Sequence, residues 1–231
     1  MLLSVFLRVL DEAEMLPGCL RRLEGVADEV ILVDSGSSDA TVRIALDWGA
    51  RVLRWKGGSA SQEVLFTPEG PIYNLALDAC QGDWVLLTAA DERLCQRAMG
   101  QLRAFLAAAP QDNVALWGVH LVLPGHYARA WLSHIPGRLV RRTAFRFDPQ
   151  AVMDQSFPLV GNGQVARPDM AILHHYYHNR HAKLERYYRL KGKPLDTVAE
   201  DIRREQAAAD LAPWPSGCGP TCARCFLNGG S

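Results

Sequence analysis

The run from Val30 to Thr41, VILVDSGSSDAT, limits the fold of this chain more than any other segment. Its first four residues are apolar and mostly β-branched, which is typical of a strand covered on both faces. Asp34 follows where that strand would end, and a Gly/Ser turn leads to Ser38 or Asp39, either of which can cap a helix. Ligands of open α/β sheets bind outside the carboxyl ends of the strands. The run therefore predicts a ligand site, the alternative being a simple βα turn with a polar cap.

The flanking segments repeat the order of strand and helix. We predict strands at 2–9, 30–33, 51–54 and 84–87, and helices at 15–23, 39–48, 72–79 and 94–108. This order is typical of a parallel sheet with right-handed crossovers. Residues 57–71 are rich in Gly, Ser and Pro and predict a long loop. Beyond Pro110 we predict short strands at 114–122 and 138–140 and helices at 182–190 and 195–209.

The charge balance argues against a nucleic-acid partner. Lys plus Arg and Asp plus Glu are equal at 25 each, so no overall field attracts nucleic acid or acidic lipid. No apolar run approaches the roughly 20 residues that span a bilayer, and the first residues lack a signal-peptide core, so we expect a cytoplasmic protein. Cys19, Cys80 and Cys95 fall in or beside predicted helices, so reduced thiols are expected.

Acidic residues follow three of the predicted strands, as Asp11 and Glu12, Asp34, and Asp91 and Glu92. Carboxylates that meet at one sheet edge repel one another unless a cation lies between them. Mg²⁺ or Mn²⁺ is typically held by one or two carboxylates together with substrate phosphates. The pattern therefore favours a metal on Asp91 and a base or ribose on Asp34. In the alternative, Asp91 and Glu92 simply begin a helix, where acids favour the macrodipole.

The ordered set of motifs resembles glycosyltransferase family 2, in particular the subgroup that glycosylates lipopolysaccharide cores and similar envelope glycans. The segments that carry the resemblance are SVFLRVLDEAEMLPGCL at 4–20, VDSGSSDAT at 33–41, NLAL at 74–77, GDWVLLTAADERL at 82–94, PGRLVRR at 136–142, AVMD at 151–154 and ILHHYY at 172–177. They span roughly residues 2 to 190 in the right order.

The resemblance implies a GT-A fold, which is a Rossmann-like, mostly parallel sheet flanked by helices with a mixed C-terminal part. We expect one domain at 1–210, with a nucleotide-binding half at 1–110, an acceptor-side half at 111–210 and a Cys/Pro/Gly-rich tail at 211–231. The implied reaction is inverting transfer of a sugar from a nucleotide-diphosphate donor to a glycan or lipid-linked acceptor. Asp154 is the implied general base. The implied donor-binding residues are Asp11, Glu12, Asp34, Ser35, Asn74, Ala89 and Arg138, and the implied ligands of Mg²⁺ or Mn²⁺ are Asp91 with His174 or His175.

The chain departs from the family pattern at polar positions. Ala89 stands where the family's DxD motif has its first acid, Met153 replaces a histidine and Asp154 a glutamate, and Tyr73 stands where a basic residue precedes Asn74. A shorter base can be misplaced by an ångström, which costs on the order of a hundredfold in rate. The alternative function is thus a catalytically degenerate protein that binds a nucleotide sugar or serves as an accessory subunit. A nucleotidyltransferase is disfavoured, because no phosphate-binding signature follows the first strand.

Two C-terminal features leave further alternatives open. Cys218, Cys222 and Cys225 have the spacing of an iron–sulfur motif and could hold a cluster or Zn²⁺, although a loosely ordered tail with free thiols also fits. The segment 180–193 carries Tyr and Arg residues that favour peripheral contact with the inner membrane face, or else form an ordinary amphipathic helix.

Overall fold

The computed structural model describes residues 1–55, 70–123, 126–128, 133–149, 164–178, 180–208 and 211–213. The strands are β1 (Leu3–Val9), β2 (Glu29–Asp34), β3 (Arg51–Arg54), β4 (Trp84–Thr88), β5 (Glu92–Leu94), β6 (Asn113–Leu123), β7 (His126–Ala128), β8 (Ser133–Arg141), β9 (Val165–Ala166), β10 (Ala171–His174) and β11 (Leu211–Pro213). The helices are α1 (Leu16–Arg21), α2 (Thr41–Trp48), α3 (Gly70–Ala79), α4 (Gln96–Ala108), α5 (Arg180–Lys191) and α6 (Val198–Ala208).

The sheet is parallel in the N-terminal half and mixed in the C-terminal half, as predicted. Its strand order is β11-β7-β6-β8-β4-β1-β2-β3, with β10 on β5 and β6 and β9 on β6. β1 pairs in parallel with β2 and β4, and β2 with β3. β8 runs antiparallel to both β4 and β6. Parallel neighbours bring their carboxyl ends to the same edge, where the predicted ligand site lies.

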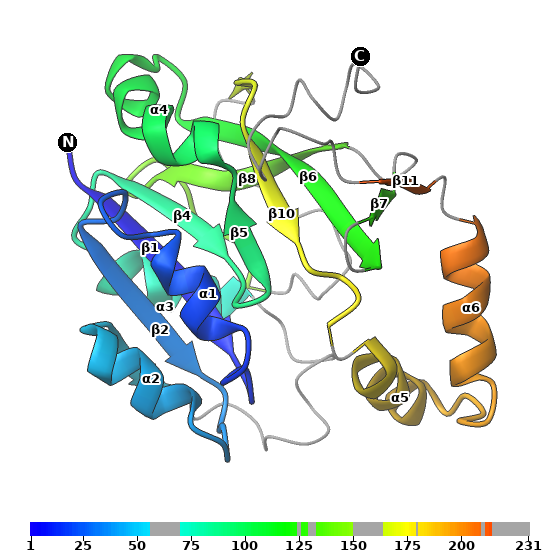
Figure 1. Ribbon diagram of the computed structural model, residues 1–231. Helices are drawn as coiled ribbons and strands as arrows, with labels where there is room; N and C mark the ends of the chain where they lie inside the picture. Colours follow the sequence, from blue (N-terminus) through cyan, green and yellow to red (C-terminus); the bar gives the residue numbers. More distant parts are fainter. Residues whose placement is uncertain are drawn as a thin grey trace.

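Alternating residues of the central strands face two hydrophobic clusters. Leu32 of β2 packs in the larger cluster, to which α1, α2 and α4 contribute, whereas Ile31 and Val33 pack in the second cluster with α3. In β1, Leu7 faces the first cluster and Phe6 the second. This period of two is that of a strand buried on both faces. Figure 1 accordingly shows α1 and α2 in front of the sheet and α3 behind it.

Gly82, just before β4, occupies a position without room for a side chain. An added Cβ would lie 2.5 Å from Ser4 Oγ and 2.6 Å from the Ser4 nitrogen. We expect Gly82→Ala to lower the free energy of unfolding by about 1–3 kcal/mol, as overpacking does. Gly100 on the exposed face of α4 is the control, because a Cβ added there would meet nothing within 4 Å. Gly100→Ala should stabilise the helix slightly, and urea denaturation of both variants measures the difference. Equal stabilities would contradict the prediction.

Three local features differ from the sequence-based expectation. Helix α4 begins at Gln96 rather than near Leu94, because residues 92–94 form β5 against β10. A strand of three residues is too short to show a periodic pattern in the sequence. It is defined by its antiparallel pairing with β10. Helix α2 begins after Ala40, whose side chain makes no capping bond, although Asp39 accepts a hydrogen bond from the Thr41 N–H at 2.9 Å. The first residues of the predicted tail form β11, which pairs with β7.

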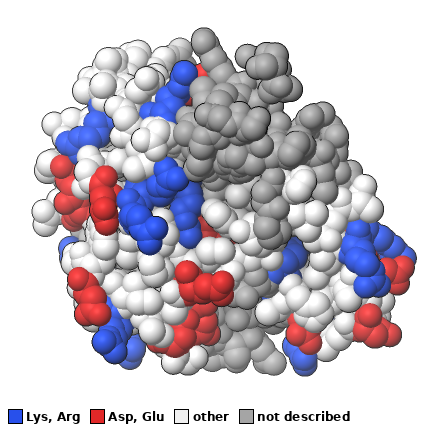
Figure 2. All heavy atoms as spheres, viewed as in Figure 1, with Lys and Arg blue, Asp and Glu red and all other residues white. Residues whose placement is uncertain are grey.

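Other predictions concern the surface and the thiols. Cys19, Cys80 and Cys95 are free thiols, as expected, and burial raises the pKa of Cys19 and of Cys80 to about 12. Acidic and basic side chains are intermixed on the face shown in Figure 2. Within the described part of the chain, no helix is both long and apolar enough to cross a membrane. The cysteines at 218, 222 and 225 lie outside the described residues, so the Zn²⁺ and Fe–S predictions are untested.

Candidate functional site

The carboxyl ends of β1, β2 and β4 lie at one edge of the sheet (Figure 1). Asp34 ends β2 and pairs with Val9 of β1, while Thr88 ends β4 and pairs with Leu7 of β1. Neighbouring strands are about 4.8 Å apart, so β2 and β4 lie roughly 10 Å apart on either side of β1. Asp91 follows shortly after Thr88 in the chain. The topology therefore brings Asp34 and Asp91 to the same edge, as the sequence predicts.

Asp34 presents a buried carboxylate oxygen that has no hydrogen-bond partner among the described residues. Its side chain is fully buried, and Oδ1 accepts a hydrogen bond from the Ser37 N–H at 2.9 Å. The unpartnered atom, Oδ2, lies 3.9 Å from Nε of Arg54, which is too far for a hydrogen bond. Because a buried acceptor without a donor is costly, this oxygen is suited to an N–H or O–H group of a ligand.

Asp11 joins two loops at the same edge. Its Oδ1 accepts hydrogen bonds from the N–H and hydroxyl of Ser38 at 2.7 and 3.1 Å, and its own N–H donates to the Ser37 hydroxyl at 3.0 Å. Its φ of 52° lies in the left-handed region, which aspartate tolerates better than most residues. The N–H of Glu12 donates to Thr41 Oγ1 at 2.8 Å. Asp11 thus holds the loop after β1 against the loop after β2, and its predicted contact with the donor stays a prediction.

Glu92 and Arg138 form a bidentate ion pair at the turn after β4. Arg138 donates from Nη2 to Oε1 at 2.6 Å and from Nη1 to Oε2 at 3.0 Å, and the Glu92 side chain is only 3% exposed. Oε2 of Glu92 also accepts hydrogen bonds from the Thr88 hydroxyl at 3.0 Å and the Ala89 N–H at 2.9 Å. The pair therefore supports the turn that carries Asp91. The predicted role of Arg138 in donor binding stays a prediction.

Asp91 contacts two nitrogen-bearing side chains through one oxygen. Its Oδ2 lies 2.5 Å from Nζ of Lys183 and 3.3 Å from Nε2 of His174, and the Asp91 side chain is 7% exposed. Burial by itself raises the pKa of Asp91, but the hydrogen bond and charge of His174 and the charge of Lys183 outweigh it and hold the pKa well below its usual range. Asp91 is therefore a carboxylate at neutral pH.

Glu12 approaches the same lysine from the loop after β1. Its Oε1 lies 3.6 Å from Nζ of Lys183, and its Oε2 lies 4.0 Å from Nε2 of His178. Burial raises the pKa of Glu12, and the charge of Lys183 opposes this shift in part. For His178, burial lowers the pKa because it disfavours the charged imidazolium, and the charge of Glu14 opposes that shift. We refer to the following residues as the strand-end site: Glu12, Asp34, Asp91, His174 and Lys183.

Aromatic rings border Asp91 on the side of β6 and β10. The ring centroids of His120 and Tyr176 lie 5.1 and 5.5 Å from that of His174, both with edge-to-face geometry. Burial, together with the charge of His174, lowers the pKa of His120 to about 4, so that this ring is neutral at pH 7. The guanidinium carbon of Arg180 lies 4.3 Å from the Tyr176 centroid. These rings enclose the strand-end site on one side.

His175, a predicted metal ligand, and Asn74, a predicted donor-binding residue, have side chains that contact other residues of the protein. His175 donates its backbone N–H to the Asp91 carbonyl at 2.8 Å, but its ring nitrogen Nδ1 lies 3.3 Å from the Tyr177 hydroxyl. Burial and the charge of Arg93 lower the pKa of His175 to about 4. The side chain of Asn74 donates to the Phe147 carbonyl and accepts from the Phe147 N–H, both at 2.9 Å. Of the two histidines predicted as metal ligands, His174 is thus the one whose ring nitrogen contacts the Asp91 carboxylate.

The remaining predicted residues are placed as follows. Ser35 is buried beside Asp34, with its Oγ 3.4 Å from Nε of Arg8. The side chain of Ala89 has no ligand atom. Asp154, the predicted general base, lies outside the described residues. The roles of these residues stay predictions.

Lys183 is the residue of the site that sequence reasoning did not single out. It lies in an ordinary charged helix, RHAKLERYYRLK, far from Asp91 in the chain. No motif or spacing distinguishes it from the other basic residues of α5. Lys183 lies close to Asp91 only in the folded protein, in which β10 and α5 lie against the turn after β4.

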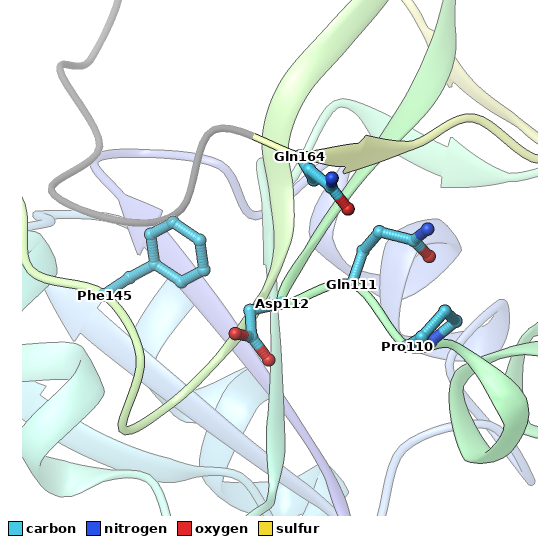
Figure 3. Close-up of a pocket in the computed structure, with 5 residues that line it drawn as sticks. All are labelled: Pro110, Gln111, Asp112, Phe145 and Gln164. Atoms are coloured by element: carbon cyan, nitrogen blue, oxygen red, sulfur yellow. The ribbon is translucent and has the colours of Figure 1, made fainter.

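A pocket of about 320 Å³ lies elsewhere on the molecule. It is lined by Pro110, Gln111, Asp112, Phe145 and Gln164, whose side chains Figure 3 shows around it. Asp112 directly precedes β6, whose first residue, Asn113, pairs with Val140 of β8. Val140 in turn pairs with Val85, near the amino end of β4. The pocket therefore lies at the opposite sheet edge from the strand-end site.

A divalent ion is implied by the family resemblance, and the described residues do not fit one as they are arranged. They contain no group of three or more His, Cys, Asp or Glu side chains placed to hold a metal. Ala89 offers no ligand atom, and the oxygen of Asp91 that faces His174 also receives the Lys183 ammonium. The Mg²⁺ or Mn²⁺ ion on Asp91, His174 or His175 therefore remains a prediction.

The fold has a solved counterpart. The 1–349 fragment of S. aureus TarS superimposes with a TM-score of 0.58 over 92% of this chain and 67% of the fragment, at 16% identity. Together with the family match below, this similarity identifies the fold as GT-A, a mixed α/β fold with a curled, mostly parallel sheet. The predicted fold class is thus confirmed.

The sequence comparisons define the family. The profile of Glycosyl transferase family 2 matches residues 4–160, more than half of the chain, and the chain therefore belongs to glycosyltransferase family 2. A TPR repeat-containing protein of Synechococcus elongatus is 37% identical over 105 residues, which cover 45% of this chain and 24% of that protein. The lipopolysaccharide core biosynthesis glycosyltransferase LpsC of Rhizobium meliloti is 29% identical over 176 residues, 71% of this chain and 60% of LpsC. The chain thus matches only part of the length of these relatives.

Proposed function

We propose that the strand-end site binds a nucleotide-diphosphate sugar and that the protein transfers the sugar to a glycan or lipid-linked acceptor. The observation that carries this proposal is the buried, unpartnered Oδ2 of Asp34 on the same sheet edge as Asp91. A separation of roughly 10 Å between β2 and β4 matches a ligand with a base at one end and a diphosphate at the other. Family membership supports the same function.

The chemistry of Asp34 narrows the base. An ionised carboxylate only accepts hydrogen bonds, so it favours a base with a ring N–H at its pairing edge. Uracil, thymine and guanine have such an N–H, whereas cytosine and adenine present a ring acceptor nitrogen there. Donors with one of the first three bases are therefore proposed.

The diphosphate end requires positive charge. As the bond between the anomeric carbon and the diphosphate oxygen breaks, its electron pair stays on the leaving diphosphate, which a cation must stabilise. A divalent ion held by Asp91 and His174 is the source that the family resemblance implies. Lys183, with its Nζ on Asp91, is the source that the contacts support.

The proposed acceptor chemistry follows from the family resemblance. We propose an inverting, single displacement in which the acceptor hydroxyl attacks the anomeric carbon and passes its proton to Asp154. LpsC is named for lipopolysaccharide core biosynthesis, which supports an envelope glycan as the acceptor. A cytoplasmic protein with peripheral contact to the membrane face is consistent with such an acceptor.

Ala89 favours a second candidate function. With an alanine where the resemblance has an acid, the chain would bind a nucleotide sugar without transferring it, as a binding protein or an accessory subunit. Binding without transfer to any acceptor would support this second candidate.

Replacing Asp34 with Asn tests the proposed base site. Asn keeps the size of the side chain and an acceptor for Ser37, but an amide N–H2 donor can then face the base. We expect Asp34→Asn to weaken nucleotide binding about 10- to 100-fold, the equivalent of one charged hydrogen bond. Calorimetric titrations with UDP, dTDP, GDP, CDP and ADP measure the effect.

The pocket at the other sheet edge supplies the control. Gln111→Ala removes one lining side chain of that pocket and should leave all five titrations unchanged. The proposal fails if no nucleotide binds the wild-type protein with or without Mg²⁺ or Mn²⁺, or if Gln111→Ala weakens binding while Asp34→Asn does not.

A further inference from the structure

The Lys183 ammonium lies where positive charge is needed beside Asp91. Its Nζ is 2.5 Å from Oδ2 of Asp91 and 3.6 Å from Oε1 of Glu12, so it lies between carboxylates from two different loops. The Asp91 side chain is 7% exposed, but that of Lys183 is 38% exposed. The ammonium thus contacts the buried carboxylate of Asp91, while part of the Lys183 side chain is accessible to a ligand.

Helix α5, which carries Lys183, is itself fixed. Arg180 in its first turn forms a bidentate ion pair with Glu205 of α6, including a 3.0 Å bond from Nε to Oε2. Leu184 and Tyr188 of α5 pack with Val198 of α6 in a small hydrophobic cluster. Figure 1 shows the two helices side by side below the end of β6, to the right of the ends of β2 and β4. Lys183 therefore reaches Asp91 from a braced element.

The same contacts leave little place for a divalent ion. Oδ2 of Asp91 already accepts the Lys183 ammonium at 2.5 Å, and Oε1 of Glu12 lies 3.6 Å from the same nitrogen, so the ammonium occupies the position between the two carboxylates. A divalent ion on Oδ2 would lie beside the ammonium, and like charges at such distances repel strongly in a buried site. The side chain of Ala89 adds no carboxylate to those of Asp91 and Glu12 that could offset the excess positive charge.

We propose that Lys183 takes the place of the metal ion, so that its ammonium binds the donor's diphosphate and the binding requires no divalent cation. This inference rests on the proposed function. An ammonium has three N–H donors: Asp91 accepts one, Glu12 lies 3.6 Å from the same nitrogen, and a remaining N–H is available to a phosphate oxygen on the exposed side. When the bond to the sugar breaks, the electron pair stays on the diphosphate oxygen, which Lys183 stabilises without transferring a proton.

Calorimetry with and without a chelator tests the inference. The wild-type protein is titrated with UDP, dTDP and GDP in EDTA, and again with Mg²⁺ and with Mn²⁺. We expect the tightest of the three to bind in EDTA within about threefold of its affinity with metal. Binding that appears only with metal would overturn the inference and leave the proposed function standing. No binding in any buffer would instead overturn the proposed function.

Variants of the lysine make the test specific. Lys183→Met should weaken binding in EDTA about 10- to 100-fold, as expected for loss of a charge-assisted hydrogen bond, whereas Lys183→Arg should retain most of it. Lys193→Met is the matched control, because it removes the same charge just beyond the end of α5, where Nζ of Lys193 lies 5.0 Å from the Tyr188 ring centroid. Unchanged binding in Lys183→Met, or equal losses in Lys183→Met and Lys193→Met, would overturn the inference.

A double variant should make nucleotide binding dependent on a divalent ion, a result that misfolding cannot produce. Ala89→Asp combined with Lys183→Met restores a second carboxylate and removes the ammonium. We expect this protein to bind the nucleoside diphosphate with Mn²⁺ and to lose binding in EDTA. Binding by the double variant that is equally strong in EDTA would contradict a role for Lys183 as the replacement of the metal.

Discussion

The Glu92→Gln variant is expected to lose about 3 kcal/mol of unfolding free energy, because it leaves Arg138 without its charged partner at a largely buried position. Gln retains one carbonyl acceptor, but the two Arg138 bonds and those from Thr88 and Ala89 together need both carboxylate oxygens. Urea denaturation measures the loss, which is large against the roughly 5–15 kcal/mol typical of whole domains.

A surface pair provides the comparison. Glu200 and Arg204 form an exposed ion pair one helical turn apart on α6, and Glu200→Gln should cost about 0.5 kcal/mol or less. If Glu92→Gln costs no more than Glu200→Gln, the ion pair does not support the turn that carries Asp91. Nucleotide binding in Glu92→Gln should also weaken, since that turn positions Asp91.

The Asp91→Asn variant is expected to lower kcat/KM for transfer at least about a hundredfold. The neutral amide keeps the shape of the side chain but no longer attracts Lys183, so the charge that faces the leaving diphosphate is no longer held in place. Losses of roughly 10²- to 10³-fold are typical when a preorganised electrostatic group is removed. Release of nucleoside diphosphate from sugar donors that carry the nucleotide selected by calorimetry measures this effect.

An exposed aspartate separates this effect from a general loss of charge. Asp47 on α2 is 70% exposed and forms an ion pair with Arg43 one helical turn away. Asp47→Asn should leave both the melting temperature and the rate unchanged. A rate for Asp91→Asn within a few fold of the wild type would show that Asp91 does not contribute to transfer.

The N-terminal half of the fold could be predicted because its signals are local. Apolar runs such as 30–33 and the turn residues after them predicted the parallel strands, and the structure places each within one or two residues of the expected ends. The shared edge of Asp34 and Asp91 followed from the same pattern, because parallel strands bring their carboxyl ends together.

The contacts within the site could not be predicted, because they depend on distant parts of the chain. Arg138 resembles a donor-binding residue in sequence, yet it forms an ion pair with Glu92, 46 positions earlier. Lys183 lies 92 positions from Asp91 in a helix rich in basic residues. The local sequence does not indicate which arginine or lysine forms an ion pair with which acidic residue. Tertiary packing decides these pairings.

Ala89, which the family resemblance implies stands in place of an acid, gains a physical interpretation from these contacts. An alanine beside an intact Asp91 indicates, in sequence, the loss of a metal ligand. In the structure the Lys183 ammonium lies on Oδ2 of Asp91 and close to Glu12, so a positive charge is already present beside Asp91. If the site has only lost a metal ligand, nucleotide binding should still depend on a divalent ion. If Lys183 replaces the ion, binding should not depend on it.

A crystal structure of the protein with a bound nucleoside diphosphate would locate both ends of the ligand. We expect a ring N–H of the base on Oδ2 of Asp34 and the diphosphate within hydrogen-bond distance of Nζ of Lys183. A nucleotide bound away from Asp34, or in the pocket beside Asp112, would contradict this expectation.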